Sequence, residues 1–128
     1  MGRNSDYFSM GLSDRGMLVI VHHPRAGAED GLATVSVTFL GMVGSFTGIN
    51  SEGVAFGNML VFNAAGRQQN DAGLTVQLAM RLAAEQSRSA AEMAAALASQ
   101  THAIPMNVMV ADPREAIVLE LGLSLIHI

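Results

Sequence analysis

The chain contains no cysteine. This absence excludes disulfide bridges and metal sites built from thiolates. Charged residues are also few, at 14% of the 128 residues, and the formal net charge is −4. A negative balance disfavours nucleic acid and anionic membrane surfaces as partners, so we expect neither. Long apolar runs are missing as well: residues 17–21 and 59–62 fall far short of the roughly 20 residues that span a bilayer.

Half of the residues are apolar, which is enough for a folded core and argues against a disordered chain. The length suits one domain or part of one. Residues 1–6 are polar and show no secretory signal. The sequence does not identify a compartment.

The first half of the chain is typical of strands interrupted by glycine. Residues 17–23 and 33–39 are rich in β-branched residues, and we expect a further strand at 54–63. Glycines at 41, 44 and 48 interrupt the stretch between them and indicate bulges or close backbone approach. The segment Asn50-Ser51-Glu52-Gly53 predicts a tight turn.

The pattern changes to helical after residue 68. Leu74, Leu78 and Leu82 recur four apart, and Val76, Ala79 and Ala83 widen this apolar stripe. The pattern predicts an amphipathic helix with Asp71 as its N-cap. A second helix is predicted from Ser89, which forms a capping box with the glutamate three residues later. Strands at 106–111 and 116–121, joined by a hairpin loop at 112–115, complete the order β-β-β-β-α-α-β-β. This order predicts an α+β fold.

The end of the chain differs from the rest. Residues 123–128 read Leu-Ser-Leu-Ile-His-Ile and resemble the translation of sequencing-adapter DNA. We therefore expect a domain at 1–122 and a non-native tail at 123–128 without function.

Three short motifs occur in a fixed order along the chain. The first is Gly2-Arg3-Asn4-Ser5-Asp6-Tyr7, the second is Gly48-Ile49-Asn50-x-x-Gly53-Val54, and the third runs from Asn107-Val-Met-Val-Ala-Asp to Val-Leu-Glu120. Together they resemble the isopenicillin N acyltransferase-like family over about residues 2–121. These are cysteine N-terminal-nucleophile (Ntn) hydrolases, similar also to bile salt hydrolases. The resemblance implies an αββα layered fold, here incomplete, and a self-processing amidohydrolase or acyltransferase.

The resemblance also implies roles for particular side chains. Arg3 would favour a thiolate nucleophile, and Asp6 would hold the thiol or the α-amino group of that cysteine in line. Asn58 would donate to the developing oxyanion, with Asn63 as the second positional match and a substrate-binding residue. Asn107 would contact the substrate or act as a second oxyanion donor. The nucleophilic cysteine would lie upstream of Gly2, so the chain as given is expected to be inactive.

Each of these residues has a simpler interpretation. Arg3 and Asp6 are three apart, so on an ideal strand they face opposite sides and could form an exposed ion pair instead. Asn50 is expected to be a turn residue, and Asn58 could be a structurally satisfied core amide. A role for Glu120 stays open.

Metal and cofactor sites are not expected. The pair His22-His23 would point to opposite faces of a strand and could not easily grip one ion. No Walker loop, dinucleotide fingerprint or serine nucleophile elbow is present. We expect no cofactor.

Three functional hypotheses remain open. The first is part of an amidohydrolase or acyltransferase whose partner is a small acylated amine or amide. The second is a non-enzymatic α+β domain that binds a small ligand. The third is a chain whose nucleophile comes from another chain. Exposed sheet edges would in each case favour association into a homo-oligomer.

Overall fold

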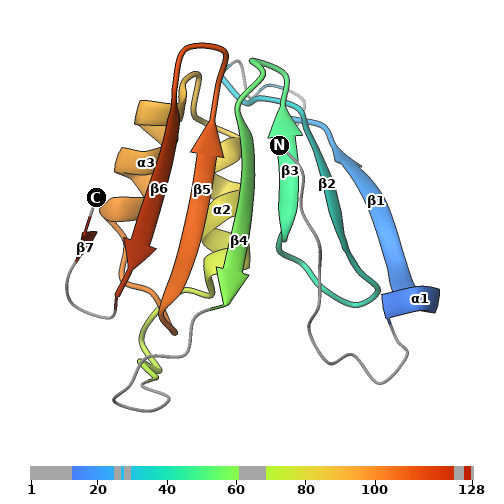
Figure 1. Cartoon of the computed structure of the whole chain (residues 1–128). Helices are drawn as coiled ribbons and strands as arrows, with labels where there is room; N and C mark the ends of the chain where they lie inside the picture. The colour runs from blue at the N-terminus through green and yellow to red at the C-terminus, as the bar shows by residue number, and fades with distance from the viewer. Residues whose placement is uncertain (1–12, 25–26, 28–29, 61–68, 123–125, 128) are drawn as a thin grey trace.

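A computed structural model describes residues 13–24, 27, 30–60, 69–122 and 126–127 of the chain. The strands form one antiparallel sheet in which the spatial order β1 to β7 is also the order along the chain (Figure 1). The α+β class predicted from the sequence is confirmed. The strands are β1 Met17–His22, β2 Thr34–Phe39, β3 Thr47–Asn50, β4 Ala55–Leu60, β5 Met106–Ala111, β6 Ala116–Leu121 and β7 Ile126–His127.

The helices interrupt this sheet only once along the chain. Helix α1 (Ser13–Gly16) precedes β1, whereas α2 (Val76–Ala84) and α3 (Ala90–Ala98) both lie between β4 and β5. Figure 1 shows α2 and α3 side by side on one face of the sheet. We call this the inner face and the opposite one the outer face. The core lies between the inner face and the two helices; its fully buried large side chains include Phe56, Met80, Met93, Leu97, Val108, Val110 and Leu119.

The strand boundaries agree with the sequence pattern to within a few residues. In β5 the side chains of Met106, Val108 and Val110 are buried and those between them are more exposed, as alternation predicts. The predicted hairpin loop is present, because Asp112 N–H donates to the Glu115 carbonyl.

The start of α2 was predicted wrongly. Its N-cap is Thr75, which makes no side-chain cap hydrogen bond, rather than Asp71. The Asp71 carboxylate accepts from Gln69 Nε2 instead. Residues 70–74 pair with the segment before β5: Leu74 forms a parallel bridge with His102. Because of this pairing, α2 begins about one turn later than an N-cap at Asp71 would place it.

The predicted apolar stripe of α2 is confirmed at Val76, Ala79 and Ala83, whereas its leucine Leu82 does not lie on the core face. Leu82 is 39% exposed, and the buried positions are Val76, Ala79, Met80, Ala83 and Ala84. Small alanines let the helix axis approach the sheet closely, so the longer side chain of Leu82 lies at its flank.

The start of α3 follows the prediction in part. Ser89 is the N-cap, and its hydroxyl accepts from the Glu92 N–H at 3.1 Å. The Glu92 carboxylate bonds the N–H of Arg88 rather than that of the cap residue. Asp112 adds a bond from the β5–β6 hairpin, since its carboxylate accepts from Ala90 N–H. The helix start is therefore fixed both locally and by the sheet.

Glycine at position 48 is required by close packing within the sheet. A Cβ atom there would lie 2.6 Å from the Val35 carbonyl oxygen and 2.7 Å from the Phe56 ring. Moving the backbone or a fully buried ring to relieve this overlap would cost free energy. The close backbone approach predicted from the glycine pattern is confirmed here.

We expect Gly48→Ala to lower the free energy of unfolding by about 1–3 kcal/mol through this overlap. Gly16→Ala is the matched control, because the nearest atom to an added Cβ is Leu40 Cβ at 3.8 Å. Urea unfolding followed by circular dichroism measures both variants. Equal stabilities for the two would contradict the packing argument.

Candidate functional site

The residues predicted to form the site divide into two groups. Arg3, Asp6 and Asn63 lie outside the described residues, so the structure does not test their roles. Asn58 and Asn107 are described, and they lie on the neighbouring strands β4 and β5.

Asn58 is almost fully buried, at 3% exposure. It lies on the inner face, two residues after the core residue Phe56. Its Nδ2 donates to the thioether sulfur of Met106 at 2.8 Å, whereas its Oδ1 is buried and has no hydrogen-bond partner. A thioether is a weak acceptor, so the amide donor can be redirected to a better acceptor at little cost. The amide nitrogen of Asn58 thus makes one weak hydrogen bond, and its amide oxygen makes none.

Asn107 lies on the other face of the sheet. Asn58 pairs with Val108, and Asn107 pairs with Met59 and with Glu120. Successive strand residues alternate between faces, so the Asn107 side chain projects from the outer face and the Asn58 side chain from the inner face. A single pocket on one face of the sheet therefore cannot be lined by both amides.

Further polar atoms lie near Asn58 at the lower end of the sheet. The N–H of Asn58 donates to the Phe46 carbonyl, and the neighbouring Ser45 donates its own N–H to the Gln77 carbonyl on α2. The Ser45 hydroxyl is buried and, like Asn58 Oδ1, has no hydrogen-bond partner. Gln77 Nε2 lies 3.7 Å from the Met106 sulfur. The amide side chains of Asn58 on β4 and Gln77 on α2 therefore converge on the Met106 thioether of β5, and backbone bonds tie the β2–β3 loop to both β4 and α2.

Sequence reasoning missed Ser45, Gln77 and Met106 as neighbours of Asn58. They come from separate elements, and no spacing along the chain connects them to it. Only the pairing of β4 with β5 and the contact of the β2–β3 loop with α2 bring them together.

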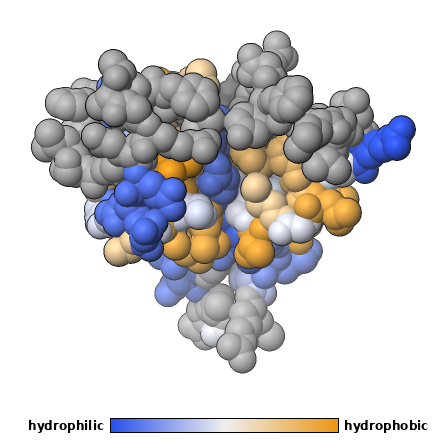
Figure 2. Space-filling view, turned by 90° about the horizontal axis from the view of Figure 1, so that it is seen from below, coloured by the Kyte–Doolittle hydropathy of each residue, from blue (hydrophilic) through white to orange (hydrophobic). Residues whose placement is uncertain are grey.

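The β2–β3 loop presents apolar side chains to solvent at this same end of the molecule. Leu40 is 76% exposed and Val43 is 68% exposed. Figure 2 views the molecule from this end and shows hydrophobic residues at the surface between hydrophilic ones. The loop is held firmly, because Leu40 N–H donates to the Gly16 carbonyl and Arg81 donates to the Val43 carbonyl.

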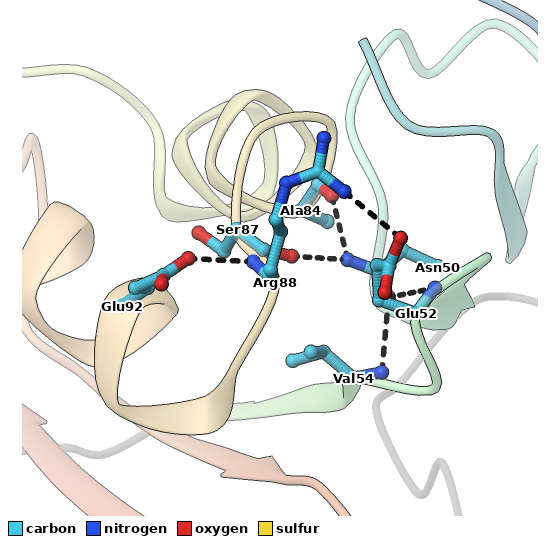
Figure 3. A network of polar contacts seen from close by, with 7 residues as sticks. All are labelled: Asn50, Glu52, Val54, Ala84, Ser87, Arg88 and Glu92. Atoms are coloured by element: carbon cyan, nitrogen blue, oxygen red, sulfur yellow. Dashed lines mark hydrogen bonds and ion pairs between the residues drawn. The ribbon is translucent and has the colours of Figure 1, made fainter. Parts of the chain in front are cut away.

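Asn50 performs a structural task, as expected for a turn residue. Its Nδ2 donates to the carbonyls of Ala84 at 2.9 Å and Ser87 at 2.7 Å, and its Oδ1 accepts from the N–H groups of Glu52 and Val54 (Figure 3). The β3–β4 turn is thereby tied to the C-terminal end of α2. With both ends of the amide occupied, Asn50 has nothing left for a substrate.

The ionisable groups of the described segments do not form a metal site. No group of three or more histidine and acidic side chains within those segments could hold an ion. Burial, and then the nearby Arg81 charge, lower the pKa of His22, while Glu85 opposes this. His22 is thus kept neutral on the inner face of β1. Hydrogen bonds from the N–H groups of Ala90 and Arg114 lower the pKa of Asp112, which fits its role at the hairpin.

A comparison with family models decides the relationship of this chain. The model described as acyl-coenzyme A:6-aminopenicillanic acid acyl-transferase matches residues 1–126. The chain belongs to this acyltransferase family. The resemblance seen in the three motifs is therefore confirmed. No curated protein matches the chain. None of the helices in the described segments has the length and apolar character to cross a membrane.

Proposed function

We infer that this chain supplies the charged and amide groups of an amide-hydrolysing or acyl-transferring site whose nucleophile is a cysteine thiolate. The family match over residues 1–126 carries this inference. The sequence holds no cysteine. The thiolate would therefore come from outside these 128 residues, and the chain alone would be inactive. The substrate would be a small acylated amine or amide.

The chemistry assigns one task to each charged group. The thiolate attacks the carbonyl carbon and forms a thioester, while the α-amino group of the same cysteine moves the proton to the leaving amine. Water or a second amine then takes the acyl group. Arg3 would favour the thiolate, and Asp6 would hold the thiol or the α-amino group in line.

Asn58 supports the proposal through its unusual hydrogen bonding. An oxyanion needs a positioned donor, and Asn58 Nδ2 is held only by the weak acceptor Met106 Sδ. The buried Asn58 Oδ1 without a partner agrees with a side chain whose surroundings are completed by another group. Asn107, on the outer face, and Asn63 would contact the substrate.

We also propose that the fold belongs to the αββα layered type. In that architecture a second sheet packs on the face opposite the helices. The outer face supports this, because Val19 is 70% exposed and Met59 is 66% exposed there. Apolar side chains at this density are expected on the inner surface of a sheet sandwich.

The proposed activity is tested by restoring the missing cysteine nucleophile. The natural upstream segment, beginning with cysteine once its leader is removed, is added to the chain. Hydrolysis of acyl-amino acids or penicillins should then appear where the chain alone has none. Ligand binding without turnover in the restored protein would instead favour the non-enzymatic binding domain.

In the restored protein we expect Arg3→Ala to raise the thiol pKa by about 1–3 units, because a positive neighbour of the thiolate is lost. Activity and the rate of thiol alkylation near neutral pH should fall together. His22→Ala is the control and should leave both unchanged. An unchanged alkylation profile in Arg3→Ala would remove Arg3 from its role. Loss of activity in a folded His22→Ala variant would point to a cysteine–histidine mechanism instead.

A further inference from the structure

Two side-chain amides converge on one sulfur atom at the start of β5. Asn58 Nδ2 on β4 donates to Met106 Sδ at 2.8 Å, and Gln77 Nε2 on α2 lies 3.7 Å from the same atom. Met106 is the first residue of β5 and is 4% exposed, so the shared acceptor is buried. The three side chains come from three elements, and only the folded chain brings both donors to one point.

The sulfur holds these amides only weakly. A thioether is a weak hydrogen-bond acceptor, whereas a carbonyl or hydroxyl oxygen in its place would bind an amide N–H firmly. A hydrogen bond to a charged acceptor is stronger than one to a neutral acceptor. The Asn58 N–H therefore gains more on moving from this sulfur to an oxyanion than it would on leaving a neutral oxygen. Catalysis depends on this difference between the ground state and the transition state.

The backbone of Gln77 is fixed beside the β2–β3 loop. Its carbonyl accepts from Ser45 N–H at 3.0 Å, and a Cβ atom at position 44 would lie 2.6 Å from the Gln77 carbonyl carbon. The Gln77 side chain is half-buried, and within the described segments its Nε2 has no acceptor other than the Met106 sulfur. This amide is therefore placed to take over the sulfur when Asn58 leaves it.

We propose that Met106 and Gln77 are positioning residues for the Asn58 amide. In the resting site the sulfur orients Asn58 Nδ2. During catalysis Asn58 turns its N–H to the oxyanion, and Gln77 Nε2 replaces it at the sulfur. Neither Met106 nor Gln77 touches the substrate, and both act through Asn58. This role rests on the proposed function, in which Asn58 is the oxyanion donor.

The first experiment measures steady-state kinetics of the restored enzyme. Met106→Leu keeps the size of the side chain and removes the acceptor. It should lower kcat about two- to tenfold, the effect of one neutral hydrogen bond, with KM unchanged. Gln77→Ala should lower kcat in the same range. Met93→Leu is the matched control, because Met93 is fully buried on α3 and its sulfur accepts no hydrogen bond within the described segments. Its kcat should stay unchanged.

A double-mutant cycle separates positioning from packing. If both residues act through Asn58, then Met106→Leu and Gln77→Ala should have no further effect on kcat in the Asn58→Leu enzyme. A further fall in kcat there would show a structural role and overturn the proposal. A low kcat in Asn58→Leu beside an unchanged kcat in Met106→Leu would overturn it and leave the proposed function standing. An unchanged kcat in Asn58→Leu would remove the oxyanion role as well.

The second experiment needs no turnover and uses the chain alone. The side-chain amide signals of Asn58 and Gln77 in nitrogen-resolved NMR spectra report what each N–H contacts. Met106→Leu should shift both signals, and Met93→Leu should shift neither. In Asn58→Leu the Gln77 signal should move, because Gln77 becomes the sole donor to the sulfur. A Gln77 signal that is the same in the wild type, Met106→Leu and Asn58→Leu would overturn the proposal.

Discussion

Asn50→Asp is expected to lower the free energy of unfolding by about 3–5 kcal/mol at pH 7, because it places a carboxylate against two carbonyl oxygens. The Ala84 and Ser87 carbonyls now accept from Asn50 Nδ2, and an aspartate oxygen has no proton to offer them. The residue is 5% exposed, so water cannot take over. The other oxygen would still accept from the N–H groups of Glu52 and Val54.

The loss should depend on pH in a defined direction. Burial favours the neutral carboxyl, so its pKa in the folded state is raised above the unfolded value of about 3.9. The variant should therefore approach the wild type in stability as the pH falls toward 4, and lose stability as the pH rises through the raised pKa.

Asn70→Asp is the matched control for this experiment. Asn70 Oδ1 accepts from Ala72 N–H in an exposed bond, and an aspartate can do the same. We expect a change within about 0.5 kcal/mol. Urea unfolding at pH 4 and pH 7 measures both variants. If the free energy of unfolding of Asn50→Asp lay within about 1 kcal/mol of the wild-type value at pH 7, the bonds from Asn50 to α2 would not stabilise the fold as expected.

The second large effect concerns Asn58 in the restored enzyme. Asn58→Leu should lower kcat by about 10²–10³-fold, the loss found when one oxyanion donor is removed. KM should change little, because the donor acts mainly on the charge that develops in the transition state. Leucine has a similar size and adds no unpaired polar atom to the core, so the fold should keep its stability.

Asn107→Ala gives the contrast. As a substrate contact on the outer face, Asn107 should affect KM more than kcat. Steady-state kinetics and urea unfolding of both variants distinguish an oxyanion donor from a substrate contact and from a structural core amide. A loss of stability in Asn58→Leu with kcat unchanged would make Asn58 a structural core amide. A fall in kcat for Asn107→Ala alone would move the oxyanion donor to the other face of the sheet.

Much of the fold could be read from periodicity, and little of the site could. The β-branched residues of 17–23 and 33–39 predicted two of the strands, and the glycines between β2 and β4 predicted the close backbone contacts. Val76, Ala79 and Ala83 of the predicted helical stripe lie on the core face, and of its leucines only Leu82 is exposed. Asp71 failed as a cap, since the pairing of Leu74 with His102 is invisible in local sequence.

The site depends on contacts that are distant in sequence. Asn58 was found by resemblance, but its bond to Met106 joins residues 48 apart. The opposite orientation of Asn58 and Asn107 follows from the register of β4 on β5, and register cannot be read from either strand alone.

The order of strands divides the sheet into two meanders with one seam. Strands β1 to β4 join neighbour to neighbour, as do β5 to β7, and each of these pairs can close as a local hairpin. Only β4 and β5 are separated in sequence by two helices, and they pair through six residue pairs from Ala55↔Ala111 to Leu60↔Met106. Both described candidate amides lie on this seam, one on each face. The least local pairing of the sheet is therefore also the one that sets the distance and direction between the two amides.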